Sequence, residues 1–100
     1  MKIEILDEAE GDLIGGFHFY ERQEPGLGWY FLDSLFSDID SLLVYAGIHE
    51  TIHAHRRCLS RRFPFAIYYS VDGDLIRVHA VLDCRRNPSW NRKRLEGRNP

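Results

Sequence analysis

Two clusters of basic residues are the features of this 100-residue sequence that are best suited to chemistry. The first cluster brackets a predicted strand and its turn, and it contains Arg56, Arg57, Arg61 and Arg62. The second cluster lies near the C-terminus around a tryptophan, and it contains Arg85, Arg86, Trp90, Arg92, Lys93 and Arg94. A planar guanidinium grips phosphate or carboxylate through two parallel hydrogen bonds, so both clusters suit an anionic partner. The alternatives are that the first cluster is a solvated sheet edge that blocks aggregation and that Trp90 packs over the end of the sheet.

Histidine, cysteine and acidic residues form two weaker groups. His53 and His55 stand two residues apart in a predicted strand, so their imidazoles share one face, as two metal ligands would. A metal needs further ligands and Cys58 lies on the opposite strand face, so we expect exposed histidines and no metal site. His79 and Asp83 are expected as neighbours on the wet face of the last strand, forming a structural pair because no nucleophile is implied nearby. No phosphate-cradling glycine loop is present, so no nucleotide or other cofactor is expected.

The composition predicts a single soluble domain over residues 1–100 with an uneven charge. A content of 44% hydrophobic and 28% charged residues allows one modest core. No apolar run approaches the roughly 20 residues of a membrane span and no signal peptide is recognisable, so a cytoplasmic protein with buried or half-buried free thiols is expected. Residues 1–50 carry 2 basic and 11 acidic side chains (−9), and residues 51–100 carry 11 basic and 4 acidic ones (+7). The second half therefore suits an anionic partner, or else acidic helices neutralise a basic sheet.

Apolar spacing predicts a strand and two helices in the first half. Residues 2–6 alternate as in a half-buried strand. Asp7 and Glu10 have the spacing of a capping box, so a helix is expected to begin at Asp7 and to end before Pro25. Its expected inner face consists of Ala9, Leu13, Phe17 and Tyr20. Small residues that would let a neighbouring helix approach closely are Gly11, Gly15 and Gly16. The second helix is expected over residues 32–46, with Gly47 as its stop.

The second half predicts three strands, at residues 52–60, 63–71 and 75–84. Asp72-Gly73 predicts a type I′ hairpin between the last two strands. The expected core face of the last strand consists of Ile76, Val78, Ala80 and Leu82. A short helix is expected at residues 88–95 with Pro88 in its first turn, followed by a frayed tail over residues 95–100. The order β-α-α-β-β-β indicates an α+β fold in which a helical hairpin packs on a small, mostly antiparallel sheet.

These elements and several local motifs resemble the RelE/ParE superfamily of toxins along almost the whole chain. The two most specific segments are Arg62-Phe63-Pro64-Phe65-Ala66-Ile67-Tyr68-Tyr69 and Arg85-Arg86-Asn87-Pro88-Ser89-Trp90. Further matching features are Ala9 after the acidic helix start, Phe19-Tyr20, and Pro25-Gly26-Leu27-Gly28 followed by Phe31. A Phe-Pro-Phe hairpin that leads to an Arg-Pro-Trp ending is similar to the pattern of ParE-like plasmid stabilisation proteins.

Two activities are implied by this resemblance. RelE-like members cut messenger RNA in the ribosomal A site, whereas characterised ParE-like members poison DNA gyrase without known nuclease activity. The nuclease pattern is poorly matched, because Ala66 stands where an arginine of the hairpin is expected and Trp90 and Asn91 stand where a proton donor is expected. Only Arg85 carries over, so the resemblance favours the ParE-like branch. If the chain is a nuclease, its candidate catalytic residues are Arg61, Arg62 and Arg85.

The resulting hypothesis is the toxin of a type II toxin–antitoxin system, which binds a cellular target such as DNA gyrase. A cognate antitoxin would neutralise it with a disordered segment that folds over the helices and the sheet. The predicted residues for binding a partner or target are Arg56, Arg57, Arg62, Arg85, Arg86, Trp90 and Arg92. One alternative is a RelE-like endoribonuclease with the ribosome and messenger RNA as partners, and another is a degenerate, non-toxic binding module. A homo-oligomer is compatible with either activity, and no membrane partner is expected.

Overall fold

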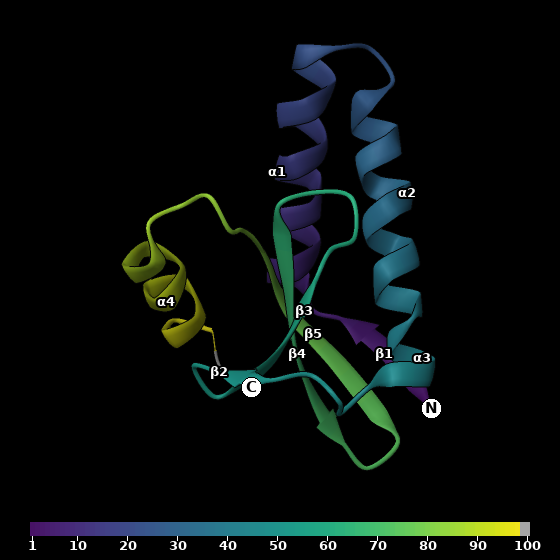
Figure 1. Cartoon of the computed structure of the whole chain (residues 1–100), viewed down its shortest axis with the longest axis vertical. Coiled ribbons are helices and arrows are strands. Elements are labelled where there is room, and N and C mark those ends of the chain that lie inside the picture. Colours follow the sequence, from purple (N-terminus) through teal and green to yellow (C-terminus); the bar gives the residue numbers. More distant parts are fainter. Residues whose placement is uncertain (99–100) are drawn as a thin grey trace.

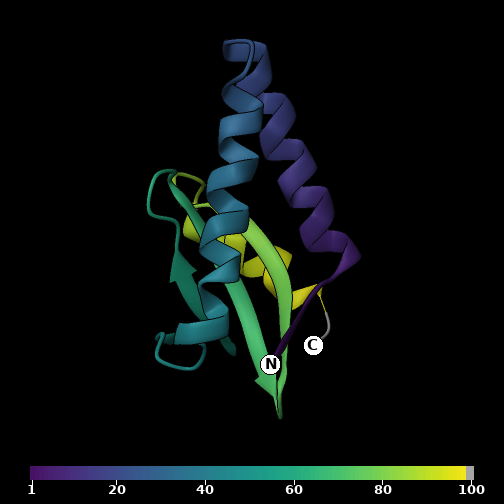
Figure 2. The ribbon, with the colours of Figure 1, turned by 90° about the vertical axis from the view of Figure 1, so that its right-hand side faces the viewer.

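The computed structural model describes residues 1–98, and it places a five-stranded sheet between two layers of helix (Figure 1). In chain order the elements are β1 (Lys2–Ile5), α1 (Asp7–Gln23), α2 (Leu27–Asp40), α3 (Leu42–Tyr45), β2 (Thr51–Ile52), β3 (His55–Leu59), β4 (Phe65–Asp72), β5 (Leu75–Asp83) and α4 (Pro88–Glu96). The sheet order is β1-β5-β4-β3-β2, with β1 parallel to β5 and every other pair antiparallel. Figure 2 shows α1 and α2 on one face of the sheet and α4 on the other. The predicted α+β fold is confirmed. Within residues 1–98, no helix combines the length and the apolar character that crossing a bilayer requires.

Two glycines let α1 and α2 pack closely. A Cβ on Gly16 would lie 2.5 Å from the ring of Phe31, and a Cβ on Gly28 would lie 2.6 Å from the carbonyl oxygen of Phe17. The predicted close approach of a second helix is therefore confirmed at Gly16. The buried residues of α1 are Ala9, Leu13, Gly16 and Tyr20. Phe17 was expected among them but is only half-buried, and its ring packs against that of Trp29 of α2, with 4.8 Å between the centroids.

The helix ends differ in part from those predicted. Leu6 is the N-cap of α1 and makes no side-chain capping bond, so Asp7 is already helical and the predicted capping box does not form. The second helix breaks at Ser41, whose hydroxyl donates to the carbonyl oxygen of Asp38 at 2.5 Å and competes with the helical backbone. The expected single helix is therefore divided into α2 and α3. Gly47 follows α3 with a φ of 93°, in agreement with its predicted role as a stop.

The predicted strand at residues 52–60 is a hairpin of two strands. Ile52 pairs with His55, and the two residues between them, His53 and Ala54, have positive φ values of 51° and 70°. Positive φ at both central positions is the type I′ pattern, which disfavours residues with a Cβ. His53 is exposed in this turn whereas His55 is 6% exposed. The expectation of two exposed histidines on one strand face is therefore wrong.

The hairpin between β4 and β5 forms as predicted, but its turn is centred one residue later. Asp72 pairs with Leu75, so the loop consists of Gly73 and Asp74. Gly73 has a φ of 62°, and Asp74 is not among the residues of positive φ. Positive φ at the first central position alone is the type II′ pattern, so the predicted type I′ turn is wrong.

A bulge at His79 exchanges the two faces of β5. Tyr69 pairs with Val78 whereas Tyr68 pairs with Ala80, so His79 is the extra residue. Beyond the bulge the predicted core face is wrong, because alternation restarts with the opposite phase. The main core beneath α1 and α2 contains Ile76, Val78 and Val81, and a second cluster beneath α4 contains Ala80 and Leu82. His79 itself is 1% exposed, so its predicted place on a wet face is also wrong.

The helix α4 covers the second face of the sheet. The Asn87 side chain accepts a hydrogen bond from the backbone N–H of Ser89, and Pro88 occupies the first turn, as predicted. Leu95 is 1% exposed within the second cluster, and Arg98 is 8% exposed. The predicted frayed tail is therefore wrong for residues 95–98, which pack against the rest of the fold. Residues 99–100 of that predicted tail lie outside the described residues.

Candidate functional site

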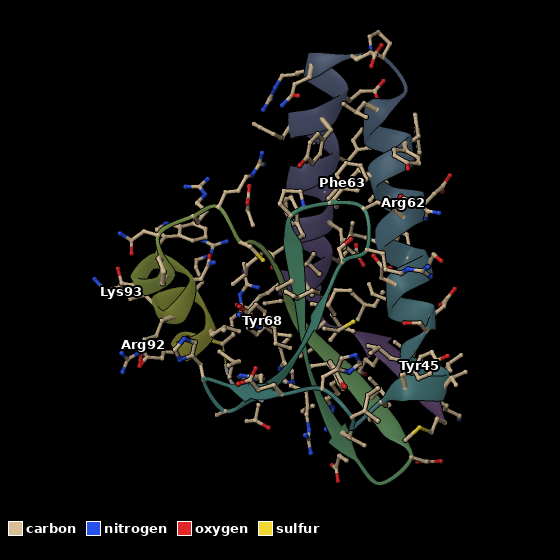
Figure 3. The ribbon with its side chains drawn as sticks, in the orientation of Figure 1. Tyr45, Arg62, Phe63, Tyr68, Arg92 and Lys93 are labelled. Atoms are coloured by element: carbon tan, nitrogen blue, oxygen red, sulfur yellow. The ribbon has the colours of Figure 1, made fainter. Side chains whose placement is uncertain are left out.

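The structure separates the first arginine cluster instead of gathering it. Arg56 and Arg57 are neighbours on β3, so their side chains leave opposite faces of the sheet. Arg56 Nη1 donates to the carbonyl oxygen of His49 at 2.7 Å, which ties the loop between α3 and β2 to the sheet. Arg57 instead borders a pocket on the side of α4. Arg61 and Arg62 are both exposed in the loop between β3 and β4, and Figure 3 shows Arg62 on the α2 side of the molecule, away from α4.

Arg85 is engaged in an internal ion pair. Its Nε donates to Asp83 Oδ1 at 3.0 Å and its Nη2 donates to Asp83 Oδ2 at 2.8 Å, while Nη2 also lies 3.4 Å from the Tyr20 hydroxyl. Burial alone would raise the pKa of Asp83, but the hydrogen bonds from Arg85 outweigh it and hold that pKa below its usual value. His79, the expected neighbour of Asp83, lies with its Nε2 2.7 Å from Ser70 Oγ. The protein itself therefore neutralises much of the charge of Arg85.

Trp90 gathers two arginines at the start of α4. The guanidinium carbon of Arg86 lies 4.4 Å from the centroid of the indole, and that of Arg94 lies 5.0 Å from it. Both distances are within the range of cation–π attraction. Arg92 lies on the outer side of α4, where its Nε is 3.6 Å from a carboxylate oxygen of Glu96 (Figure 3). The second cluster is therefore divided, with Arg86, Trp90 and Arg94 together and Arg92 apart.

A groove runs between α1 and α4 and has β5 as part of its floor. This α1–α4 groove has a volume of about 350 Å³. Its lining includes Gly11, Gly15, Phe19 and Arg22 of α1, Phe65 and Val81 of the sheet, and Arg86, Trp90 and Arg94 at α4. A second cavity of about 540 Å³ adjoins it and shares Gly11, Asp12 and Arg94 with it. On the α1 side the groove is open at Gly11 and Gly15, because these residues have no side chain and a Cβ on either would meet nothing within 4 Å.

Internal ion pairs leave the groove with a positive balance. Arg98 bonds both oxygens of Asp12, at 2.5 and 2.9 Å, and both side chains are 7% exposed. These hydrogen bonds raise the pKa of Arg98. Asp83, the other acidic residue of the groove, is bonded to Arg85. Within residues 1–98, the side chains of Arg22 and Arg86 form no ion pair or hydrogen bond, so their charges are available to a partner.

A smaller pocket, which we call the sheet pocket, lies where β2, β3 and β4 approach the start of α4. It has a volume of about 120 Å³ and is lined by Ile52, His53, Arg57, Tyr68, Cys84, Arg86, Pro88 and Asn91. Burial raises the pKa of Tyr68, and partial desolvation raises the pKa of the Cys84 thiol although that residue is exposed, so both groups remain protonated near neutral pH. Asn91 Nδ2 donates to the carbonyl oxygen of Asp83 at 3.1 Å, whereas its buried Oδ1 has no partner within residues 1–98. The pocket therefore combines two cations, neutral donors and one unused acceptor.

The residues considered for metal binding do not come together. His55 Nδ1 lies 3.0 Å from the backbone oxygen of His53, and Cys58 is buried in the main core beneath the helices. No three His, Cys, Asp or Glu side chains form a possible metal site in the part of the chain that the structure describes. Cys84 is exposed, so its predicted burial is wrong, whereas that of Cys58 is confirmed.

Sequence reasoning missed part of both sites because their residues come from distant segments. Arg22 belongs to α1 and Arg86 to the loop before α4, and only the packing of α1 beside β5 places them on one groove. No motif or spacing in the sequence marked Asn91, because its place in the lining of the sheet pocket depends on which side of α4 faces the sheet. The spacing of Gly11 and Gly15 did indicate close approach of another segment, but it did not show that this side of α1 stays open.

Comparison with solved structures finds the same fold in a toxin–antitoxin protein. A chain of the structure described as the chromosomal ParDE TA system from P. aeruginosa matches with a TM-score of 0.73 and 17% identity, over 81% of this chain and 92% of that chain. The fold is RelE/ParE-like. The resemblance predicted from the sequence is thus confirmed as a likeness of fold. No family model matches the sequence, and no curated protein matches it.

Proposed function

We propose that this chain is the toxin of a type II toxin–antitoxin pair of the ParE-like kind, and that a cognate antitoxin neutralises it by binding. The observation that carries this proposal is the fold, which 81% of the chain shares with a chain of a ParDE system. The available arginines of the α1–α4 groove support it, because they offer an anionic protein segment a place to bind. An antitoxin segment that folds on its toxin buries a large area and remains sensitive to proteolysis when free, which suits a switch.

Action by binding is supported by the state of the predicted catalytic residues. Arg85 is paired with Asp83, and Arg62 lies on the far side of the molecule from α4. DNA gyrase is the target that the ParE-like resemblance implies. The predicted contact residues that border the groove or the sheet pocket are Arg57, Arg86 and Trp90. The other predicted contact residues lie outside both the α1–α4 groove and the sheet pocket, and they are Arg56, Arg62, Arg85 and Arg92.

Inducible expression in a bacterial host tests the proposal. We expect the chain alone to arrest growth, and we expect the small DNA-binding protein encoded beside its gene to relieve the arrest and to co-purify with it. A neighbour that neither binds the chain nor relieves arrest refutes the proposal. Binding without any arrest identifies a non-toxic binding module instead. A supercoiling assay with purified gyrase tests the target, and undiminished supercoiling would reject gyrase while leaving the toxin assignment in place.

The sheet pocket favours RNA cleavage as a second candidate function. Attack by a ribose 2′-hydroxyl on its phosphate needs cations that stabilise the charged transition state and groups that move protons. Arg57 and Arg86 supply the cations, the imidazole of His53 in the same lining would accept the proton of the attacking 2′-hydroxyl, and the protonated Tyr68 hydroxyl would give its proton to the leaving 5′-oxygen. The unused Oδ1 of Asn91 is an acceptor that a ribose hydroxyl would satisfy. The predicted candidates Arg61, Arg62 and Arg85 do not line this pocket.

Primer extension on cellular messages after induction decides between the two candidates. Cleavage in the sheet pocket predicts cuts that disappear in Arg57→Ala and persist in the matched variant Arg92→Ala, because Arg92 lies on the outer side of α4. Cuts that disappear in Arg85→Ala but persist in Arg57→Ala would move the chemistry out of the sheet pocket. Growth arrest without any cut would reject RNA cleavage and support action by binding.

A further inference from the structure

The strand β1 leaves one edge of the sheet open. The sheet order places β1 at one end, and within residues 1–98 β1 pairs with β5 alone (Figure 1). The N–H groups of Lys2 and Leu6 donate to backbone oxygens of the β4–β5 hairpin at 2.9 and 3.1 Å. Backbone groups of successive residues in a strand point to opposite edges, so those of Ile3 and Ile5 point away from β5. Ile3 and Ile5 can therefore bind a further strand through their N–H and C=O groups.

The side chains of β1 alternate between charged and apolar. Lys2 and Glu4 are exposed on one face, whereas Ile3 and Ile5 are half-buried against the main core on the other face. Charged residues often protect an open edge from pairing. Here the two charges have opposite signs and stand two residues apart, so an antiparallel strand of the same sequence can match them. Within residues 1–98, Lys2 has no ion pair, and Glu4 is 52% exposed with Arg77 Nε at 3.3 Å.

A second copy of the chain fits this edge in one register. A two-fold axis at Ile3 sets Ile3 opposite its own copy as a hydrogen-bonded pair, and it sets Lys2 opposite Glu4 of the second copy on both sides of the axis. An axis at Lys2 or at Glu4 would instead set like charges opposite each other, which destabilises a sheet. An axis at Ile5 would set Ile3 opposite Asp7, which already belongs to α1. Backbone direction and charge therefore select the same register.

We propose that the chain forms a two-fold symmetric dimer through the outer edge of β1, which joins two five-stranded sheets into one continuous sheet. Reciprocal hydrogen bonds between the two Ile3 residues and two Lys2–Glu4 pairs hold the copies together. Ile5 then stands opposite Met1 of the second copy, and Met1 is 57% exposed in the single chain. The other end of the sheet offers less, because β2 has two residues whereas β1 has four. This inference does not depend on the toxin assignment.

Sedimentation of the full chain at concentrations from about 1 to about 200 µM tests the proposal. The interface is short, so we expect a monomer–dimer equilibrium with Kd in the micromolar range. Lys2→Glu or Glu4→Lys replaces both opposite-charge pairs with like-charge pairs, and each should raise Kd by at least about tenfold. The double variant Lys2→Glu with Glu4→Lys restores opposite charges in the same register, so its Kd should return to within about threefold of the wild type.

Lys93→Glu is the matched control for Lys2→Glu. It makes the same change of charge at an exposed position of α4, on the other face of the sheet from α1 and α2, so Kd should stay within about twofold (Figure 3). A wild-type chain that stays monomeric at about 200 µM overturns the dimer. Single variants that leave Kd unchanged, or a double variant that fails to restore association, overturn the register at β1.

Hydrogen exchange of the wild type gives a second measurement that needs no variant. The N–H groups of Ile3 and Ile5 face the open edge in the single chain, so their protection should rise with protein concentration as dimers form. The N–H of Leu6 is bonded to Val78 at 3.1 Å in either state, so its protection should not depend on dimer formation. Protection of Ile3 and Ile5 that is independent of concentration while the chain associates would place the interface elsewhere and overturn the proposal.

Discussion

Replacing Arg98 with methionine should remove the main attachment of the C-terminal segment to α1. Arg98 bonds both oxygens of Asp12, at 2.5 and 2.9 Å, and Nη1 also donates to the carbonyl oxygen of His79 at 3.2 Å. Both side chains of the ion pair are 7% exposed, and removing one partner of a buried pair costs about 3–5 kcal/mol because the other charge stays buried. In the variant, Asp12 would still accept the hydrogen bond from the Val81 N–H and would keep its longer ion pair with the Arg94 guanidinium. We therefore expect the lower end of the range, about 3 kcal/mol.

Urea denaturation followed by circular dichroism measures this loss. A change of about 3 kcal/mol is a large part of the roughly 5–15 kcal/mol that stabilises a typical domain, and it corresponds to a fall in Tm of roughly 12–24 °C. Arg92→Met is the matched control, because Arg92 is 62% exposed and its partner Glu96 is 60% exposed, so its loss should stay within about 0.5 kcal/mol. Adding Asp12→Asn to Arg98→Met should restore part of the stability, since no buried charge then remains. A loss below about 1 kcal/mol for Arg98→Met, or one equal to the control, would refute the reasoning.

Three further predictions concern the helical hairpin, the turn between β2 and β3, and the dependence of stability on pH. Gly16→Ala should destabilise the fold by about 1–3 kcal/mol because its Cβ would lie 2.5 Å from the Phe31 ring, whereas Gly11→Ala meets open space and should stabilise it by up to about 1 kcal/mol. Ala54→Gly should raise the urea midpoint, since it relieves a φ of 70° that costs about 1–2 kcal/mol in a residue with a Cβ; an unchanged or lower midpoint would contradict this. Burial lowers the pKa of His49, so its contribution to stability is fully present above the unfolded value of about 6.5 and is lost as the pH falls through the folded pKa. Between about pH 7.5 and about pH 5, the free energy of unfolding measured by denaturation should therefore fall less for His49→Gln than for the wild type. Equal falls in the two proteins would contradict this role of His49.

The sequence by itself determined the order and type of the elements and, through them, the fold class. Its reliable signals were local ones, in which neighbouring residues restrict the backbone directly. Asn87-Pro88 begins α4, and Gly47 and Gly73 take the positive φ values that turns require. The motifs around Pro64 and Trp90 pointed to the RelE/ParE-like fold that the structural comparison confirms. These signals depend on chemistry within a few residues, so they can be recognised without knowing what packs against them.

Only the tertiary structure decided which side chains face one another. The bulge at His79 reverses the faces of β5, and α4 buries a face that alternation alone assigned to water. The pairing of Asp12 with Arg98 joins the two ends of the chain, and Arg22 and Arg86 come to one groove from opposite halves. Such contacts form only when the sheet and both helical layers close together, so no spacing within a single segment encodes them. Strand and helix propensities therefore predicted the scaffold, whereas the groove and its available charges follow from how the layers pack.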